Sequence, residues 1–172
     1  MERIAKFELV SKEQWLKDYT AIFGESEAVR KDAEKAYAEL KLPKRATAGS
    51  AGYDIYCPVN IVLSAGQGMK IPTGIRVRMR EGYALMIVPR SGLGSRYRFQ
   101  LDNTVGVIDS DYYHSENSGH IFVPMINDSR NGKQLDLRAG TAFVQGVFIP
   151  FGITEDDEAS GVRTGGFGST GI

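Results

Sequence analysis

The sequence predicts a mainly β domain, a sandwich or barrel of short strands, with a hairpin of two helices near its N-terminus. Two observations support this prediction. Up to Pro43 the apolar residues recur at helical spacing, whereas after Pro43 short β-rich runs alternate with turns rich in glycine and asparagine. A chain of 172 residues also has the length of one ordinary domain, so we expect residues 1–172 to form a single unit.

Residues 11–41 carry the signals of a helical hairpin. Ser11 is placed to cap the first helix, with Gln14 three residues later, and Ser26 is placed to cap the second. We interpret the hairpin as a structural decoration of the β core, and a binding surface for a protein partner is the alternative. The aromatic residues expected to pack on the core are Trp15, Tyr19 and Phe23.

Four runs within residues 42–160, the expected β core, have the composition of strands. GIRVRMR alternates apolar with basic residues at a period of two, which is typical of a half-buried strand. The other three runs are rich in β-branched, aromatic and other apolar residues. The four expected strands are residues 74–80, 83–89, 120–127 and 143–151.

The charge balance and the few metal-binding residues exclude several functions. Lysine plus arginine equals aspartate plus glutamate at 21 each, so nothing indicates a nucleic-acid partner. One cysteine, Cys57, and two histidines, His114 and His120, cannot assemble the usual zinc sites, and we expect both histidines to be solvated or structural. No apolar run has the length of a signal-peptide core or a membrane helix. We therefore expect a cytoplasmic protein without membrane contact, from a bacterial or a phage-infected cell.

Five short segments of the β region carry polar groups suited to chemistry: residues 51–56, 89–96, 103–113, 140–146 and 163–171. PRSGLGSR, at 89–96, reads as a glycine-rich turn that offers a guanidinium, a hydroxyl and glycine amides, the donors that a di- or triphosphate requires. RTGGFGSTG, at 163–171, offers a second set. Asp109 follows an apolar run, so its carboxylate is expected at the end of a buried strand, where it can be fixed as a general base.

In this order and at these spacings, the five segments resemble the five motifs of the homotrimeric dUTP nucleotidohydrolases, the dUTPases. The similarity extends from about Leu42 to the C-terminus. The resemblance implies a jelly-roll or β-barrel-like fold and a homotrimer whose active sites are shared between subunits. Residues 161–172 would be a mobile C-terminal arm that closes a neighbouring subunit's site. The implied reaction converts dUTP to dUMP and pyrophosphate, with Mg²⁺ held through the substrate phosphates and no direct protein ligand.

The resemblance also implies a role for individual residues. Asp109 would activate water for attack on the α-phosphorus. Asn103 and Gly106 would read the uracil edge, and Tyr112 would pack on the deoxyribose. Asp54 would organise phosphate and metal indirectly, without contacting them. The remaining substrate-binding residues would be Arg90, Ser91, Gly92, Gln145, Arg163, Phe167, Gly168, Ser169 and Thr170.

Three positions depart from the family pattern. Residues 113–118, YHSENS, are an insertion beside the expected nucleoside pocket. Ala142 stands where the fourth motif usually carries an arginine, and Arg163 is one residue closer to the Gly-Gly-Phe than is common. The candidates for the missing arginine are Arg96, Arg98 and Arg130.

Two other functions are compatible with the same resemblance. A dCTP deaminase, or a bifunctional deaminase and dUTPase, would share the fold, but GHIFVPMIND lacks the carboxylate that deaminases usually have there. A regulator in which dUTP gates a protein contact is the other alternative, and the presence of Asp109 argues against a catalytically silent protein.

Overall fold

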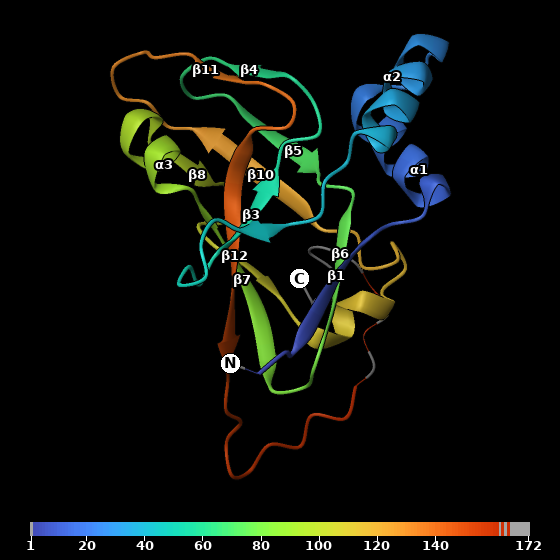
Figure 1. The fold of residues 1–172 in the computed structure, drawn as a ribbon, viewed down its shortest axis with the longest axis vertical. Coiled ribbons are helices and arrows are strands. Elements are labelled where there is room, and N and C mark those ends of the chain that lie inside the picture. Colours follow the sequence, from blue (N-terminus) through green and yellow to red (C-terminus); the bar gives the residue numbers. More distant parts are fainter. Residues whose placement is uncertain (1, 162, 164, 166–172) are drawn as a thin grey trace.

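The computed structural model describes residues 2–161 together with residues 163 and 165. Most of this part of the chain is built from short strands, with helices at two sides of the β core (Figure 1). The helices are α1 Lys12–Phe23, α2 Glu27–Ala38, α3 Ser91–Tyr97 and the 3₁₀ helix η1 Ser110–His114. The strands are β1 Ala5–Leu9, β2 Lys44–Arg45, β3 Tyr53–Tyr56, β4 Ile61–Leu63, β5 Gly68–Pro72, β6 Ile75–Met79, β7 Tyr83–Pro89, β8 Phe99–Leu101, β9 Gly106–Ile108, β10 Phe122–Asn127, β11 Leu135–Leu137 and β12 Ala142–Pro150.

The described strands form four antiparallel sheets. The largest has the order β2-β3-β12-β7-β9, and a second has the order β5-β10-β8. The pairs β1-β6 and β4-β11 form two smaller sheets. This jelly-roll-like arrangement confirms the predicted mainly β fold with its N-terminal helical hairpin. Strand β12 has the most central role, because it pairs with β3 along one edge and with β7 along the other.

The main hydrophobic core lies between these sheets. The inward residues of β6 are Ile75, Val77 and Met79, which alternate with arginines as the period of two predicted. Strands β7, β10 and β12 each lie within one residue or two of the runs expected from the sequence. Apolar residues of all four sheets meet in one cluster, so the β region is a single packed unit.

The helical hairpin begins where the capping residues predicted. The Ser11 Oγ accepts a hydrogen bond from the Gln14 N–H at 3.1 Å, and the Ser26 Oγ accepts one from the Val29 N–H at 3.3 Å. Trp15 is fully buried, and its indole N–H donates to the Ala33 carbonyl at 2.8 Å. The hairpin therefore has a small core of its own, placed beside the β core (Figure 1).

Two elements differ from the sequence prediction. Strand β1 was not expected, because no element was assigned to residues 1–10; it pairs with β6 from Ala5↔Met79 to Leu9↔Ile75. Residues 91–97, expected as a glycine-rich turn, form the helix α3. Within the described part of the chain, neither α1, α2 nor α3 is long and apolar enough to cross a bilayer.

Candidate active site

One group of predicted site residues lies where β3, β7 and β12 run side by side. The register places Gln145 opposite Asp54 on one side and opposite Val88 on the other. Arg90 follows the end of β7, and its Nε lies 3.1 Å from the Asp54 Oδ1. Because Asp54 is mostly buried whereas Arg90 is 44% exposed, the carboxylate holds the base of a guanidinium that remains accessible to a ligand.

Gly52 allows this group to pack closely. A Cβ at Gly52 would lie 2.4 Å from the Gln145 Oε1, a distance at which the amide would have to move. The Gln145 Nε2 is also 3.5 Å from the Pro89 carbonyl, so the amide bridges the first and second segments. Ser91 and Gly92 begin α3 beside Arg90 and are both exposed. The structure thus brings together the groups predicted to bind phosphates from segments 51–56, 89–96 and 140–146.

A hairpin after β8 carries the residues predicted to read uracil. Asn103 at its tip is exposed, and the Thr104 N–H donates to the Leu101 carbonyl at 2.9 Å. Thr104 has φ +72°, a left-handed conformation that is strained for a β-branched residue. Gly106 fits tightly, since a Cβ there would lie 3.3 Å from the Ile87 Cβ. The hairpin is consequently a narrow turn whose following strand packs closely on β7.

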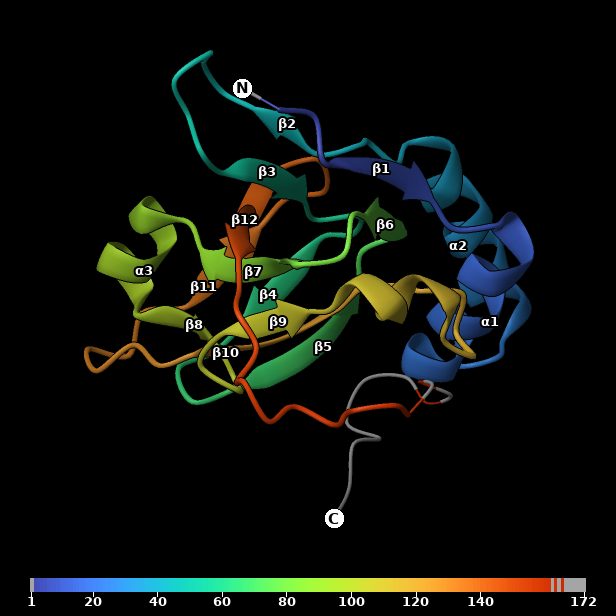
Figure 2. The same cartoon turned by 90° about the horizontal axis from the view of Figure 1, so that it is seen from below.

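Asp109 follows the buried Ile108 at the end of β9, as the sequence predicted. Its side chain is 48% exposed, and the Asp109 Oδ2 lies 2.5 Å from the Arg163 Nη2. The Arg163 Nε is 3.0 Å from the Asp111 Oδ1, and its guanidinium lies 5.7 Å from the centre of the Tyr112 ring. Arg163 belongs to the segment after β12, which returns toward η1 (Figure 2). Asp111 was not singled out from the sequence, where it resembled a solvated turn residue.

The hydroxyl of Tyr112 is held by two hydrogen bonds. The residue is only 3% exposed, and its hydroxyl donates to the His120 carbonyl at 2.8 Å and accepts from the Asn117 Nδ2 at 2.8 Å. Burial raises the pKa of the Tyr112 phenol, so it stays a neutral donor. His120 is fully buried and His114 is exposed, so both occupy the non-catalytic kinds of position expected of them.

The insertion 113–118 is ordered by local hydrogen bonds. The Ser115 Oγ lies 2.7 Å from the Asn117 Oδ1 within the segment, and the Asn117 Nδ2 donates to the Tyr112 hydroxyl. The Tyr113 hydroxyl donates to the Glu8 Oε2 at 2.6 Å, and the Arg76 guanidinium lies 3.6 Å from the centre of the Tyr113 ring. The insertion thus packs against β1 and β6, and it leaves Asp109 and Asp111 at the surface.

The two groups of predicted site residues lie at opposite ends of β7. Strand β9 pairs with β7 through Leu85↔Ile108, so Asp109 lies beyond Leu85. Arg90 lies five residues along β7 in the other direction, roughly 17 Å at the rise of an extended strand. Within one chain, the described residues therefore do not place Asp109 and Arg90 close enough to contact the same triphosphate.

The three candidates for the missing fourth-motif arginine lie together at the C-terminal end of α3. Arg96, Arg98 and Arg130 line one pocket of about 210 Å³. The Arg98 Nε lies 3.0 Å from the Asp128 Oδ2. Ala142, where the family usually has the arginine, is the first residue of β12. Phe167, Gly168, Ser169 and Thr170 lie outside the described residues, as does most of the predicted arm.

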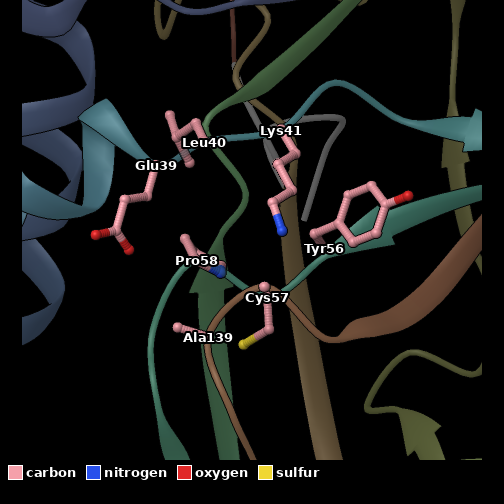
Figure 3. A pocket seen from close by; sticks show the side chains of 8 residues that line it. Glu39, Leu40, Lys41, Tyr56, Cys57, Pro58 and Ala139 are labelled. Carbon is pink, nitrogen blue, oxygen red and sulfur yellow. The ribbon is translucent and has the colours of Figure 1, made fainter.

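A separate pocket of about 330 Å³ lies between the end of α2 and β3 (Figure 3). Its lining includes Lys41, whose Nζ is 5.6 Å from the centre of the Tyr56 ring, and Cys57. Burial raises the pKa of the Cys57 thiol to about 11, which keeps it protonated and unreactive at neutral pH. The residues that line this pocket include none of the predicted site residues, so it is not the candidate active site.

The fold and the two groups of polar side chains define a jelly-roll-like β protein that presents arginine, hydroxyl and backbone donors at one site and a partly exposed carboxylate, Asp109, at another. A model of the dUTPase family matches residues 38–171, and the chain belongs to this family. This confirms the resemblance drawn from the sequence, and with it the class of enzyme, a nucleotide hydrolase. The helices α1 and most of α2 precede the matched region.

Two relatives and two solved structures illustrate the family relationship. Deoxyuridine 5'-triphosphate nucleotidohydrolase from Lactococcus lactis subsp. lactis is 41% identical over 137 residues, which cover 78% of this chain and 90% of that protein. The protein of the same description from Chromobacterium violaceum is 39% identical over 138 residues, covering 76% and 87% of the two chains. The crystal structure of dUTPase from Streptococcus mutans has a TM-score of 0.63 and 36% identity, and the match covers 87% of this chain and 98% of that one. A Staphylococcus bacteriophage 80alpha dUTPase with dUPNHPP, at 20% identity and a TM-score of 0.61 over 99% and 100% of the two chains, shares the fold.

Proposed function

We propose that this protein hydrolyses dUTP to dUMP and pyrophosphate in the cytoplasm, which supplies dUMP and limits the incorporation of uracil into DNA. The observation that carries the proposal is the position of Asp109, a carboxylate at the end of the half-buried strand β9, which follows the hairpin of residues 102–105, in a chain of the dUTPase family. Its relatives from L. lactis and C. violaceum carry that activity in their names.

Asp109 acts as the general base. Its carboxylate takes a proton from a water molecule, whose oxygen attacks the α-phosphorus while the bond to the bridging oxygen of the β-phosphate breaks and pyrophosphate leaves. Arg90, Ser91 and Gly92 bind the phosphate chain, with Asp54 fixing the guanidinium of Arg90 and Gln145 packed beside it. Such a reaction needs charge neutralisation more than covalent help, so no nucleophilic side chain is required.

The nucleobase and the sugar are read by different elements. Uracil presents an N–H between two carbonyls, and the backbone at Asn103 and Gly106 provides the matching groups. Cytosine would leave buried polar groups unpaired, which gives discrimination on the order of 10⁴. Tyr112 packs on the deoxyribose and excludes a 2′-hydroxyl. Arg163 grips the γ-phosphate after leaving Asp109, while Ser169 and Thr170 add hydroxyls and Phe167 and Gly168 cover the base.

Mg²⁺ is proposed to bind through oxygens of the substrate phosphates and water. Among the described residues, no group of three or more histidine, cysteine, aspartate or glutamate side chains could hold a metal ion. Asp54, Asp109 and Asp111 are each paired with an arginine. The cation would neutralise phosphate charge, as suits an ion that keeps most of its water ligands.

A homotrimer would join the two groups that one chain holds apart. In such an assembly Asp109 of one subunit faces Arg90 of another, and the segment after β12 extends toward a neighbour once Arg163 has left Asp109. Exposed apolar residues of β9 and of this segment support an interface, because Val107, Phe151 and Ile153 are 53%, 49% and 74% exposed.

The substrate is tested by a pyrophosphate-release panel over dUTP, dCTP, dTTP and UTP, with and without Mg²⁺. Selective release from dUTP supports the proposal, whereas ammonia release from dCTP would identify a deaminase. Asp109→Asn should lower turnover by about 10²–10⁴-fold while binding of a non-hydrolysable dUTP analogue persists. Asp136→Asn, at an exposed aspartate of β11 paired with Arg138, is the matched control and should behave as wild type.

Sharing of the site between subunits is tested by complementation. Asp109→Asn and Arg90→Ala subunits are each inactive in homotrimers, but trimers refolded from an equal mixture should regain activity at about a quarter of their sites. A site contained within one subunit would give no recovery.

A further inference from the structure

Asp18, on α1, is joined to the predicted nucleoside pocket by a continuous set of buried and partly buried hydrogen bonds. The His120 Nδ1 lies 2.6 Å from the Asp18 Oδ2, and the Gln14 Nε2 donates to the same oxygen at 2.9 Å. The Gly74 N–H donates to the His120 Nε2 at 2.8 Å. Since Nε2 is the acceptor, the ring proton is on Nδ1 and donates to Asp18, which fixes the tautomer and the orientation of the imidazole.

The same residue, His120, also fixes the hydroxyl of Tyr112. Its carbonyl accepts hydrogen bonds from the Tyr112 hydroxyl at 2.8 Å and from the Asn117 Nδ2 at 2.9 Å. The imidazole is fully buried, between Trp15 at 6.0 Å and Phe122 at 4.5 Å between ring centres. A buried ring that is hydrogen-bonded at both nitrogens cannot move unless its own backbone moves with it. The position of the His120 carbonyl is therefore coupled to the position of the ring.

Asp18 also acts on Tyr112 through its charge. The pKa of Tyr112 is raised mainly by burial, and the negative charge of Asp18 raises it further. Both the hydrogen-bonded path and the field therefore lead from α1 to Tyr112.

We propose that Asp18 is a positioning residue for sugar selection: through His120 it holds Tyr112 where the tyrosine excludes a 2′-hydroxyl. The inference rests on the proposed function of Tyr112. The family match begins at residue 38, so it assigns no role to Asp18. On this account the helical hairpin does more than decorate the β core, because one of its side chains sets the geometry of a pocket wall.

The test is the ratio of kcat/KM for dUTP to that for UTP. Asp18→Ala removes the acceptor and should lower this ratio on the order of tenfold, mainly through a higher KM for dUTP, because a small displacement of a pocket wall has a large effect on a bound substrate. Asp18→Asn keeps a carbonyl oxygen for the His120 N–H and should restore the ratio to near the wild-type value. Asp32→Ala, at an exposed aspartate of α2, is the matched control.

Each result has a definite reading. An unchanged ratio in folded Asp18→Ala, with only a lower melting temperature, overturns the inference and makes Asp18 a structural brace. If Asp18→Ala does not fold, Asp18→Glu carries the test, since it keeps the charge but displaces the carboxylate by one methylene; a wild-type ratio in that variant also overturns the inference. Tyr112→Ala separates this failure from failure of the proposed function: it should lower the ratio whatever Asp18 does, and absent dUTP turnover in the wild type would reject the function itself.

Discussion

The guanidinium of Arg163 pairs with Asp109, with 2.5 Å between Nη2 and Oδ2. The residue predicted to grip the γ-phosphate is thus paired with the residue predicted to activate water. The guanidinium occupies the Asp109 Oδ2, the kind of oxygen that a general base presents to a water molecule. Substrate binding would therefore have to transfer Arg163 from a carboxylate to a phosphate, which also frees Asp109 for catalysis.

Replacement of Arg163 should weaken binding in a manner that depends on the γ-phosphate. We expect Arg163→Ala to weaken binding of a non-hydrolysable dUTP analogue by about 10–100-fold, since hydrogen bonds to charged groups contribute about 1.5–3 kcal/mol. Binding of dUDP, which has no γ-phosphate, should change much less. Calorimetric titration of both ligands measures the difference, with Arg138→Ala as an exposed control. Equal losses for both ligands would contradict contact with the γ-phosphate.

The sequence predicted those features that depend on neighbouring residues. Ser11 and Ser26 cap helices because a cap is decided within three residues, and β6 was recognised by its alternating side chains. The position of Asp109 followed from the apolar run before it. These signals are local, so they are complete in one short stretch of sequence.

The features that the sequence did not predict depend on distant partners. Strand β1 is recognisable only through its pairing with β6, and α3 contains Gly92 and Gly94, which disfavour a helix. The contact between Asp18 and His120 joins residues 102 positions apart. The pairing of Arg163 with Asp109 likewise needs the chain to return from β12 to β9.

The hairpin's core depends on Trp15. We expect Trp15→Ala to lower the free energy of unfolding by about 3–5 kcal/mol, because it removes a fully buried aromatic side chain and leaves a cavity. Phe23→Ala, at a partly buried position on the same helix, should cost less. Urea unfolding followed by circular dichroism measures both. A loss under 1 kcal/mol for Trp15→Ala would mean that the stability of the hairpin does not depend on the packing of Trp15.

Deletion of residues 11–41 addresses the role of the hairpin as a whole. Loss of folding would support a structural role, whereas an intact, active trimer would leave the surface available to a protein partner. The inference about Asp18 adds a further expectation: a folded deletion variant should discriminate less between dUTP and UTP. Wild-type discrimination in that variant would argue against any contribution from α1.

Cys57 should be inert to thiol reagents in the native protein. Burial raises its pKa to about 11, and its Sγ lies 3.1 Å from the Val59 carbonyl. At pH 8 the thiolate fraction is on the order of 10⁻³, and the residue is only 1% exposed. Labelling with a disulfide reagent should therefore be at least about 100-fold slower than in denaturant, with Cys57→Ser as the blank. Rapid labelling of native protein would show that the pocket beside α2 opens.

Glu8 should make the stability of the β1 region depend on acid pH. The Tyr113 hydroxyl is the main group that holds the pKa of Glu8 below its usual range, and Lys6 and Arg76 act in the same direction. A lowered pKa in the folded state means that the ionised carboxylate stabilises the fold at neutral pH. This stabilisation is lost as the pH falls below the ordinary glutamate value of about 4.3 and through the lowered one.

The expected result is a pH-dependent difference between wild type and Glu8→Gln. At pH 7 the wild type should be more stable by a few tenths to about 1 kcal/mol, because the pair is partly exposed and solvent weakens it. As the pH falls through the lowered pKa of Glu8, the two proteins should converge. Unfolding free energies from urea titrations between pH 3 and 7 measure the effect, with Glu116→Gln, at an exposed glutamate of the insertion, as the control. A difference that stayed constant over this range would show that Tyr113 and Glu8 interact without regard to charge.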